Sequence, residues 1–504
     1  MLARSLLWLF LAPALLLFGC AEKAPEETAQ AAEAGYLSFA EEAFSVAYPP
    51  WPQQPLGENL LAVGKDYCSV AVKKEDFPYL PRAFESRAEV IALALERGGF
   101  IFTEKDIRAE EAKLDFTKGS GTSGIHGVIR LIPCSEKIYW VMVSCPSGGN
   151  DSFFERVLDS AECSVPPSGL REEACPPATL GFAQRKFLLA TTTSSAYKTG
   201  ESWALAMERL PDVADVMLWM FIPKYEEFLP GHAVSENTSG AVEATKIFLE
   251  THGVDLFVGI DPTSGLNRSK LYELNSRHTT FADPDFRQTF KSAAVYYARE
   301  LRPKYMALGI EINMYYPGNE EDFENYLSLY RETRREVKRV SPDTKVFATM
   351  QLEDMQALWL APTHNSTWYV LEEMDDDMDL VVLSTYPSLV YASPSQIPAD
   401  YFSRVREHTS LPIAVGETGY PTGDGVIGDR GSQQKQNEYL ARLLREADEL
   451  DMEFVTWITM YDPEWEDLPE VLKPFEDMGL RHANDTPKQA WCVMKAAKDL
   501  SYRS

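Results

Sequence analysis

The sequence predicts a (β/α)8 barrel preceded by a small α+β domain. From residue 181 onward, eight short apolar runs alternate with segments of helical periodicity over about 320 residues, which is the pattern of such a barrel. Two of these runs end in a glutamate, Glu311 and Glu417, where a barrel opens. Before residue 166, short strands follow one another as hairpins with few helices between them, which indicates an α+β domain.

The expected barrel strands are short runs rich in β-branched and aromatic residues, and each precedes an amphipathic segment. We expect strands at 187–191, 216–221, 256–260, 305–312, 345–350, 380–384, 413–417 and 454–459. We expect helices at 201–208, 241–251, 285–300, 321–339, 366–374, 399–407, 433–450 and 488–500. The barrel therefore occupies residues 181–504.

Residues 36–165 form the expected α+β domain, and residues 166–180, with four prolines, form the linker to the barrel. The opening run Phe44-Ser-Val-Ala-Tyr-Pro49 and the last hairpin followed by a helix resemble the PsbP-type α/β/α sandwich of secreted bacterial proteins. Residues 119–124 match G-x-G-x-x-G but lie between two strands, so we expect a hairpin turn there. No cofactor is expected.

The first 20 residues have the features of a secretory signal that ends in a lipobox. Arg4 precedes an apolar run that ends in Leu17-Phe-Gly-Cys20. This pattern resembles that of bacterial lipoproteins, so Cys20 is expected to be lipidated and residues 21–35 to form a flexible tether. Ala21, in place of Asp, favours the outer membrane, facing either the periplasm or the exterior. The alternative is an ordinary signal peptide in which Cys20 has no special role.

Charge and cysteine content restrict the partners. The formal net charge of −28 argues against nucleic acid, which needs a basic face. Six cysteines follow Cys20 without any C-x-x-C spacing, and in an oxidising compartment this favours disulfides over a metal site. One pair is expected, Cys175 with Cys492, because closing the barrel brings its first strand and last helix together. The seven histidines form no H-E-x-x-H motif, and no metal is expected.

The two glutamates are the main candidates for catalysis. Side chains alternate along a strand, so Glu311 and Asn313 are expected on one face, and Val415 and Glu417 on one face of the other strand. Both carboxylates then reach one pocket. Two such carboxylates are the catalytic groups of a retaining glycoside hydrolase, in which one is the nucleophile and the other the general acid and base.

Residues 181–504 resemble the clan of retaining glycoside hydrolases with a (β/α)8 barrel, nearest to endo-β-1,4-galactanases and cellulase-like relatives. The residues that carry the resemblance are Asp379-Leu-Val-Val-Leu-Ser-Thr-Tyr386-Pro, Gly416-Glu417-Thr-Gly-Tyr-Pro and Gly479-Leu480. The resemblance implies that Glu311 is the acid/base, that Glu417 is the nucleophile with Tyr386 donating to it, and that Trp457 forms the floor of the sugar site. Like charges close together raise one pKa, expected to be that of Glu311.

The sequence departs from this clan at two positions. Ile310 stands where the clan has an asparagine that holds the sugar 2-hydroxyl, and Asn313 is the candidate to replace it. The arginine at the end of the second strand is also missing. Further candidates for sugar binding are Trp219 and Tyr461 by stacking, and Asp261 and Asp462 by hydrogen bonds to hydroxyls. The alternative for each is core packing or loop capping.

Three functions are compatible with these observations. The first is hydrolysis of β-glycosidic bonds in a polysaccharide or oligosaccharide by a lipoprotein anchored through Cys20. The second is a non-catalytic lipoprotein that binds glycan or cell-wall polymer on a degenerate barrel. The third is a structural lipoprotein whose first domain carries the function. The two departures, Ile310 and the missing arginine, are what favour the second function over the first.

Overall fold

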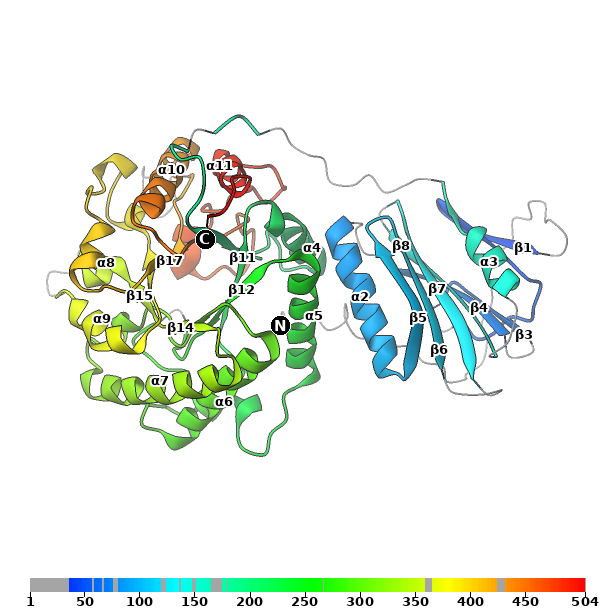
Figure 1. The fold of residues 1–504 in the computed structure, drawn as a ribbon, viewed down its shortest axis with the longest axis horizontal. Helices are drawn as coiled ribbons and strands as arrows, with labels where there is room; N and C mark the ends of the chain where they lie inside the picture. The colour runs from blue at the N-terminus through cyan, green and yellow to red at the C-terminus, as the bar shows by residue number, and fades with distance from the viewer. Residues whose placement is uncertain are drawn as a thin grey trace. The chain divides into compact units, whose positions relative to one another are not determined.

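The computed structural model describes residues 36–503 apart from 57–58, 66–67, 76–79, 119–123, 136, 147–150, 165–174, 179, 266, 359–364 and 424–430. The chain forms two compact units, Met1–Glu172 and Glu173–Ser504, each described by itself below (Figure 1). The expected signal, Cys20 and the tether lie outside the described residues, as do most of the glycine-rich turn and most of the linker.

The first unit is built on antiparallel sheet. Its described strands form a six-stranded sheet of order β3-β4-β8-β7-β6-β5 and a three-stranded sheet of order β1-β2-β9. Helix α2 contacts β5 and β6, whereas α3 contacts β2, β7 and β8 (Figure 1). The bounds are β1 Leu37–Glu41, β2 Phe44–Tyr48, β3 Leu61–Lys65, β4 Cys68–Glu75, α2 Pro81–Arg97, β5 Phe100–Arg108, β6 Glu111–Lys118, β7 Ile125–Cys134, β8 Lys137–Pro146, α3 Asp151–Asp159 and β9 Glu162–Cys163.

The core of this unit lies between the two sheets and α3. Phe44 stacks on Tyr139 with ring centroids 4.3 Å apart, and Phe154 of α3 closes the same cluster. The disulfides Cys68–Cys145 and Cys134–Cys163 tie strands of this unit together, and they confirm the expectation that the cysteines form disulfides.

The second unit is a (β/α)8 barrel, as the sequence predicts. Its parallel strands follow in the order β14-β13-β12-β11-β10-β18-β17-β16-β15. Only Ala348 separates β14 from β15, and these pair with opposite neighbours, so the two form one strand that closes the ring. The bounds are β10 Leu188–Thr192, β11 Val216–Phe221, β12 Asp255–Ile260, β13 Tyr305–Ala307, β14 Lys345–Phe347, β15 Thr349–Gln351, β16 Val381–Thr385, β17 Ile413–Thr418 and β18 Phe454–Trp457.

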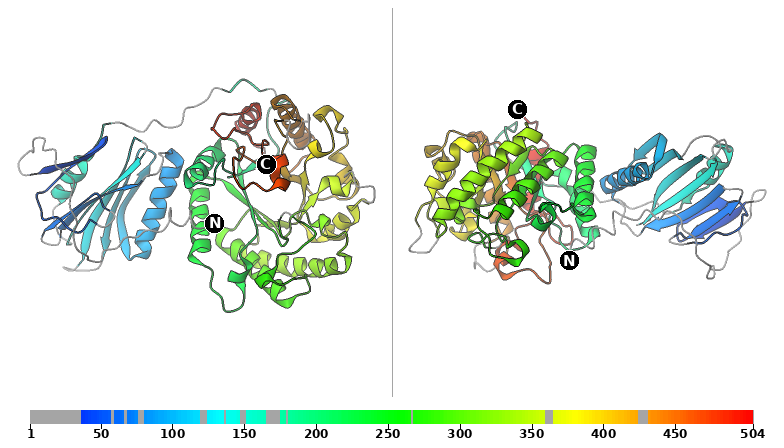
Figure 2. Two further views of the ribbon diagram at one scale, coloured as in Figure 1. Left: turned by 180° about the vertical axis from the view of Figure 1, so that it is seen from behind. Right: turned by 90° about the horizontal axis from the view of Figure 1, so that it is seen from below.

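Helices surround these strands (Figure 2). Their bounds are α4 Gly200–Arg209, α5 Glu236–His252, α6 Pro284–Leu301, α7 Glu320–Val340, α8 Leu352–Met355, α9 Trp368–Met374, α10 Gln433–Glu449 and α11 Gln489–Lys498. The α-helix expected at 399–407 is wrong, because this segment forms only a 3-10 helix at Ser403–Glu407. The side chains of Thr199, Ser235, Asp283 and Ser432 accept from backbone N–H groups at the starts of α4, α5, α6 and α10, which is ordinary N-capping.

Aromatic side chains fill the barrel interior. The ring of Phe257 lies 5.3 Å from Phe347 and 5.6 Å from Phe454, and Phe454 lies 4.5 Å from Tyr305. All four side chains are buried, and each is worth about 1.5–3 kcal/mol of transfer free energy. The barrel is therefore a packed core beneath its mouth, and a site has to be built at the strand ends.

The disulfide Cys175–Cys492 joins the start of this unit to α11, with the two Cα atoms 5.3 Å apart. The pairing expected from barrel closure is confirmed. Among the described residues, no helix is both long and apolar enough to cross a membrane.

Candidate active site

Glu311 reaches the barrel mouth through a local distortion of the backbone. Strand β13 ends at Ala307, and the Cα of Gly309 faces the hydroxyl of Tyr326 on α7. Ile310 instead faces the neighbouring strand at Gly259, and Glu311 adopts the left-handed region with φ 49°. The alternation expected along this strand is therefore wrong. A left-handed glutamate costs about 1–3 kcal/mol, which is typical of a functional position.

Glu417 reaches the mouth through a bulge in β17. The register with β16 shifts between Leu383 and Ser384, so that Leu383 pairs with Val415 but Ser384 pairs with Glu417. The Cα of Gly416 faces Val382, Phe257 and Thr349, which come from three other barrel strands. The expected shared face of Val415 and Glu417 is therefore wrong, because the bulge redirects the side chains that follow it.

Arg268 joins the acidic groups of the mouth. Its Nε donates to Oε2 of Glu311 over 3.0 Å, and its Nη1 donates to Oδ2 of Asp261. The other oxygen of Asp261, Oδ1, accepts from the backbone N and the hydroxyl of Thr263, over 2.8 Å and 2.7 Å. Asp261, predicted to bind sugar hydroxyls, thus holds Arg268 beside Glu311. The charges of Asp261, Glu311 and Glu417 raise the pKa of Arg268 against the opposing effect of burial.

Glu417 is buried as well. The hydroxyl of Tyr386 donates to its Oε2 over 3.0 Å, and its Oε1 has no hydrogen-bond partner among the described residues. Burial, followed by the charge of Glu311, raises the pKa of Glu417 to about 8. We expected Glu417 to stay ionised with Glu311 as the raised group. In the free protein the expectation that Glu417 stays ionised is wrong. Glu417 is buried, and Arg268 bonds to Glu311 and not to Glu417.

A second buried carboxylate organises the strand ends next to Tyr386. Oε1 of Glu353 accepts from the hydroxyls of Thr385 and Tyr401, and from the backbone N of Tyr386 over 2.7 Å. Its Oε2 accepts from Gln351 over 2.7 Å. Glu353 has no exposed surface, and burial raises its pKa. This carboxyl group fixes the backbone from which Tyr386 reaches Glu417.

Three residues expected to bind sugar lie elsewhere. Asn313 is fully buried, and its amide bonds to Gln351 and Asp354, because the left-handed turn at Glu311 directs it under the mouth. Trp457 has no exposed surface, and its Nε1 donates to the Met478 carbonyl over 2.8 Å, so no ring face is open to a sugar. Trp219 packs on Tyr297 of α6, which places it toward the helix layer.

Asp462 and Tyr461 belong to polar networks of their own. Asp462 accepts from Lys488 over 2.7 Å and from the backbone N of Gly479 over 2.9 Å. The hydroxyl of Tyr461 donates to Asp485 over 2.5 Å, and its side chain is buried. Both side chains stabilise the segments after β18, so Asp462 has the loop-capping role that was the alternative to sugar binding.

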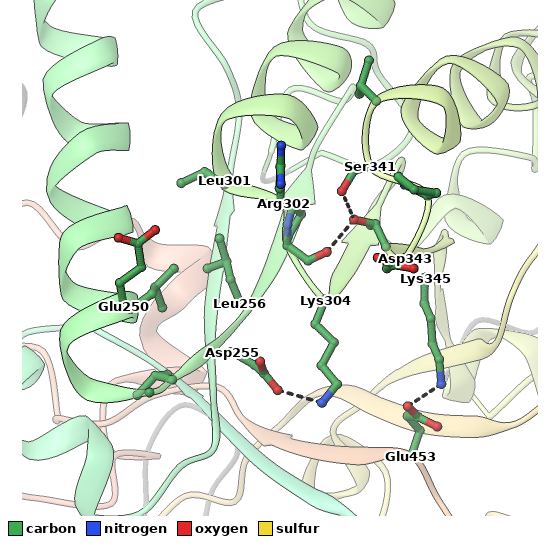
Figure 3. A pocket seen from close by; sticks show the side chains of 17 residues that line it. Glu250, Asp255, Leu256, Leu301, Arg302, Lys304, Ser341, Asp343, Lys345 and Glu453 are labelled. Atoms are coloured by element: carbon green, nitrogen blue, oxygen red, sulfur yellow. Dashed lines mark hydrogen bonds and ion pairs between the residues drawn. The ribbon is translucent and has the colours of Figure 1, made fainter.

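A hollow with described lining lies at the opposite end of the barrel. Its volume is about 870 Å³, and its lining includes the residues that begin β12 and β14. Lys304 pairs with Asp255 over 2.7 Å and Lys345 pairs with Glu453 over 2.5 Å, and Figure 3 draws both pairs. Neither catalytic candidate lines it, so we do not assign the chemistry to this hollow.

Sequence reasoning missed Arg268 and Glu353. Arg268 lies in the loop after the third strand, seven residues after Asp261, where the chain 261–270 holds no recognisable motif. The available signal was the arginine missing from the second strand, because a cluster of carboxylates needs a compensating cation from another loop. Glu353 gave a weaker signal, an acid two residues after the end of β15.

No protein-family model matches the chain, and no curated protein sequence matches it. Solved structures of glycosidases resemble it. An exo-β-1,4-mannosidase from Opitutaceae bacterium strain TAV5 gives a TM-score of 0.47 at 15% identity, over 62% of this chain and 60% of that chain. A GH5_18 protein from Bifidobacterium longum subsp. infantis gives 0.48 at 14% identity, over 63% and 80%. A GH5_18 protein from Streptomyces cattleya in complex with GlcNAc gives 0.46 at 16% identity, over 64% and 83%.

This chain spans less than two thirds of the length of the mannosidase. The likenesses concern the fold alone, which the strand order given above establishes independently.

Proposed function

We propose that the barrel hydrolyses β-glycosidic bonds of a polysaccharide or oligosaccharide with retention of configuration. The observation that carries the proposal is the meeting of Glu311, from the fourth strand, and Glu417, from the seventh, at one end of the barrel. Two local distortions bring them there, and Tyr386 and Arg268 bond to one each. A purely structural barrel gains nothing from burying a carboxyl oxygen without a partner, as at Oε1 of Glu417.

The reaction would run in two displacements. As substrate binds, the proton that Glu417 holds in the free protein passes to Glu311. In the first displacement, an oxygen of the Glu417 carboxylate attacks the anomeric carbon, the bond to the leaving oxygen breaks, and Glu311 gives that oxygen its proton. In the second, Glu311 takes a proton from water, the water oxygen attacks the anomeric carbon, and the ester to Glu417 breaks. Tyr386 orients Glu417 for attack through its hydrogen bond.

A mechanism-based label tests this proposal. The full chain is incubated with 2-deoxy-2-fluoro glycosides of β-glucose, β-galactose and β-mannose that carry a good leaving group, and its peptides are analysed by mass spectrometry. We expect the added mass of one fluoro-sugar on the peptide that contains Glu417, and none in Glu417→Gln. Label on another carboxylate, or turnover of a glycan without any label, contradicts the assignment of Glu417 as nucleophile.

A second candidate function is glycan binding without hydrolysis. It is favoured by Ile310, which leaves no amide at the position of the sugar 2-hydroxyl, and by the lack of an arginine at the end of β11. Binding without catalysis predicts that an immobilised polysaccharide retains the protein, that no fluoro-sugar label forms, and that Glu417→Gln does not weaken retention.

We also propose that the protein is a lipoprotein of the bacterial cell envelope, anchored through Cys20. This proposal rests on the apolar run and the Leu-Phe-Gly-Cys ending of the first 20 residues. A lipid anchor holds the hydrolase next to polymers of the envelope or to glycans that arrive from outside.

A further inference from the structure

Among the described residues at the barrel mouth, Arg268 is the cation that bonds to Glu311, and it comes from an unexpected element. Strand β11 and the two residues after it, 216–223, hold no lysine or arginine. Arg268 instead enters from the loop after β12, and only 17% of its side chain is exposed. A guanidinium this buried is stable only when acidic partners surround it.

The contacts of Arg268 are directional. Nε faces Oε2 of Glu311 and Nη1 faces Oδ2 of Asp261, so the planar guanidinium bridges two carboxylates. Asp261 is itself bonded on several sides. Thr263 donates twice to its Oδ1, the backbone N of Asp261 donates to the Phe221 carbonyl, and the hydroxyl of Tyr225 donates to the Asp261 carbonyl. Asp261 therefore fixes the position of Arg268, and Arg268 in turn fixes the side chain of Glu311.

We propose that Arg268, fixed by Asp261, is a positioning residue that holds Glu311 in place at the mouth and sets how protons divide between Glu311 and Glu417. The inference rests on the proposed hydrolase function and adds the residue that tunes it. In the free protein Arg268 occupies Oε2 of Glu311, so that oxygen is unable to carry the proton for the leaving group. Bound substrate has to displace this contact, or Glu311 has to act through Oε1.

The groups that face this cluster come from four elements. Asp261 and Arg268 follow β12, Glu311 follows β13, Tyr386 follows β16, and Glu417 is the last residue but one of β17. Removal of Arg268 takes its positive charge away from the three carboxylates of Asp261, Glu311 and Glu417, which favours protonation of the pair. The two macroscopic pKa values of a coupled pair then rise together, and the pH optimum of the enzyme follows them.

The test compares Arg268→Met, Arg268→Gln and Arg268→Lys with a matched control, Arg277→Met. Arg277 is an exposed arginine that pairs with Asp285 on the surface. With the aryl β-glycoside that wild type cleaves best, we expect both neutral variants to shift the bell-shaped pH profile of kcat/KM upward by about one pH unit. We expect Arg268→Lys to keep the profile but to lower kcat about tenfold, because an ammonium group does not bridge both carboxylates. Arg277→Met should match wild type.

A loss of rate in Arg268→Met and Arg268→Gln without any movement of the profile overturns the inference, because a merely structural role lowers the rate equally at every pH. Arg268→Gln keeps a donor to Glu311, so it provides the neutral test if Arg268→Met does not fold.

A measurement without substrate separates this inference from the proposed function. The stability gain caused by Glu417→Gln is measured at pH 8 by thermal unfolding, in the wild-type and in the Arg268→Gln background. We expect a larger gain in the second background, since Glu417 has then lost a neighbouring cation. Equal gains contradict the role of Arg268 even if the enzyme is active. Unequal gains in a protein that cleaves no glycoside support Arg268 and contradict the hydrolase proposal instead.

Discussion

The hydroxyl of Tyr386 donates a hydrogen bond of 3.0 Å to Oε2 of Glu417, while Oε1 of the same carboxyl group has no partner among the described residues. One oxygen is thus oriented by the protein and the other is left for a ligand. Glu353 anchors the backbone N of Tyr386, and the ring of Phe475 packs edge-on against Tyr386 with centroids 4.8 Å apart. The tyrosine is therefore held on two sides and has little freedom to leave Glu417.

Tyr386→Phe tests this relationship. A hydrogen bond to a charged group is worth about 1.5–3 kcal/mol, so we expect kcat/KM to fall on the order of 10- to 100-fold. Because the hydroxyl lowers the pKa of Glu417, its loss should also move the acidic limb of the pH profile upward. The measurement is the pH dependence of aryl glycoside hydrolysis. Tyr391→Phe is the control, since Tyr391 is a half-buried tyrosine that does not bond to Glu417. An equal loss of kcat/KM in both variants would contradict the role of Tyr386.

Glu417→Gln is expected to stabilise the protein, and increasingly so at higher pH. The usual glutamate pKa of 4.5 is raised to about 8 at Glu417. Between these values the folded protein holds a proton that the unfolded chain has released, so the free energy of unfolding falls as pH rises. The substitution removes this loss of stability, which is at most about 1.4 kcal/mol per pH unit.

Thermal unfolding of wild type and Glu417→Gln at intervals from pH 5 to pH 8 checks this prediction. The expected result is a difference in Tm that widens with pH. Glu311→Gln is the contrast, because it breaks the ion pair with Arg268 and should bring no gain. A constant or shrinking difference for Glu417→Gln would mean that Glu417 is ionised in the folded protein.

The sequence predicted the large features of the barrel because they depend on repeated patterns. Eight apolar runs, the ordinals of the two glutamate-bearing strands and the Cys175–Cys492 pair all follow from alternation of strand and helix around a closed ring. The path of each glutamate to the mouth did not follow from such a pattern. The left-handed backbone at Glu311 and the bulge before Glu417 each involve a single residue, and the two-residue alternation of strand side chains does not encode them.

Side chains at the mouth were harder to predict for a related reason. Asn313 and Trp457 have the residue types that bind sugars, but buried polar groups take the nearest partners, and here these are Gln351, Asp354 and the Met478 carbonyl. Arg268 lies 43 residues before Glu311, and its contact depends on the shape of a loop. Composition and spacing carry no information on that shape.

Cys20→Ser tests the lipid anchor. Acyl chains supply about 0.8 kcal/mol per buried CH₂, so their loss should release the protein from membranes or leave it unprocessed. Fractionation of the expressing cells, with detection of the protein in the membrane and soluble fractions, checks the outcome. Cys175→Ser is a control that changes a cysteine of a disulfide and leaves the lipobox intact. A membrane fraction that is the same for Cys20→Ser and wild type would refute lipidation at this residue.

The two glutamates can be told apart by rescue with azide. In Glu417→Gly no nucleophile remains, so turnover of every substrate should stop, and azide should enter the vacated space to give a glycosyl azide of inverted configuration. In Glu311→Ala the first step should survive for aryl glycosides with good leaving groups, which need no proton, so the glycosyl-enzyme accumulates and azide gives a product of retained configuration. The configuration of the azide product is read by NMR, with Glu321→Ala on α7 as a control outside the mouth. Products of opposite configuration from the two variants assign both roles. If neither substitution changes hydrolysis, the chemistry lies elsewhere. If the two configurations are reversed, Glu311 is the nucleophile and Glu417 the acid and base. Arg268 favours that arrangement in the free protein, because it bonds to Glu311.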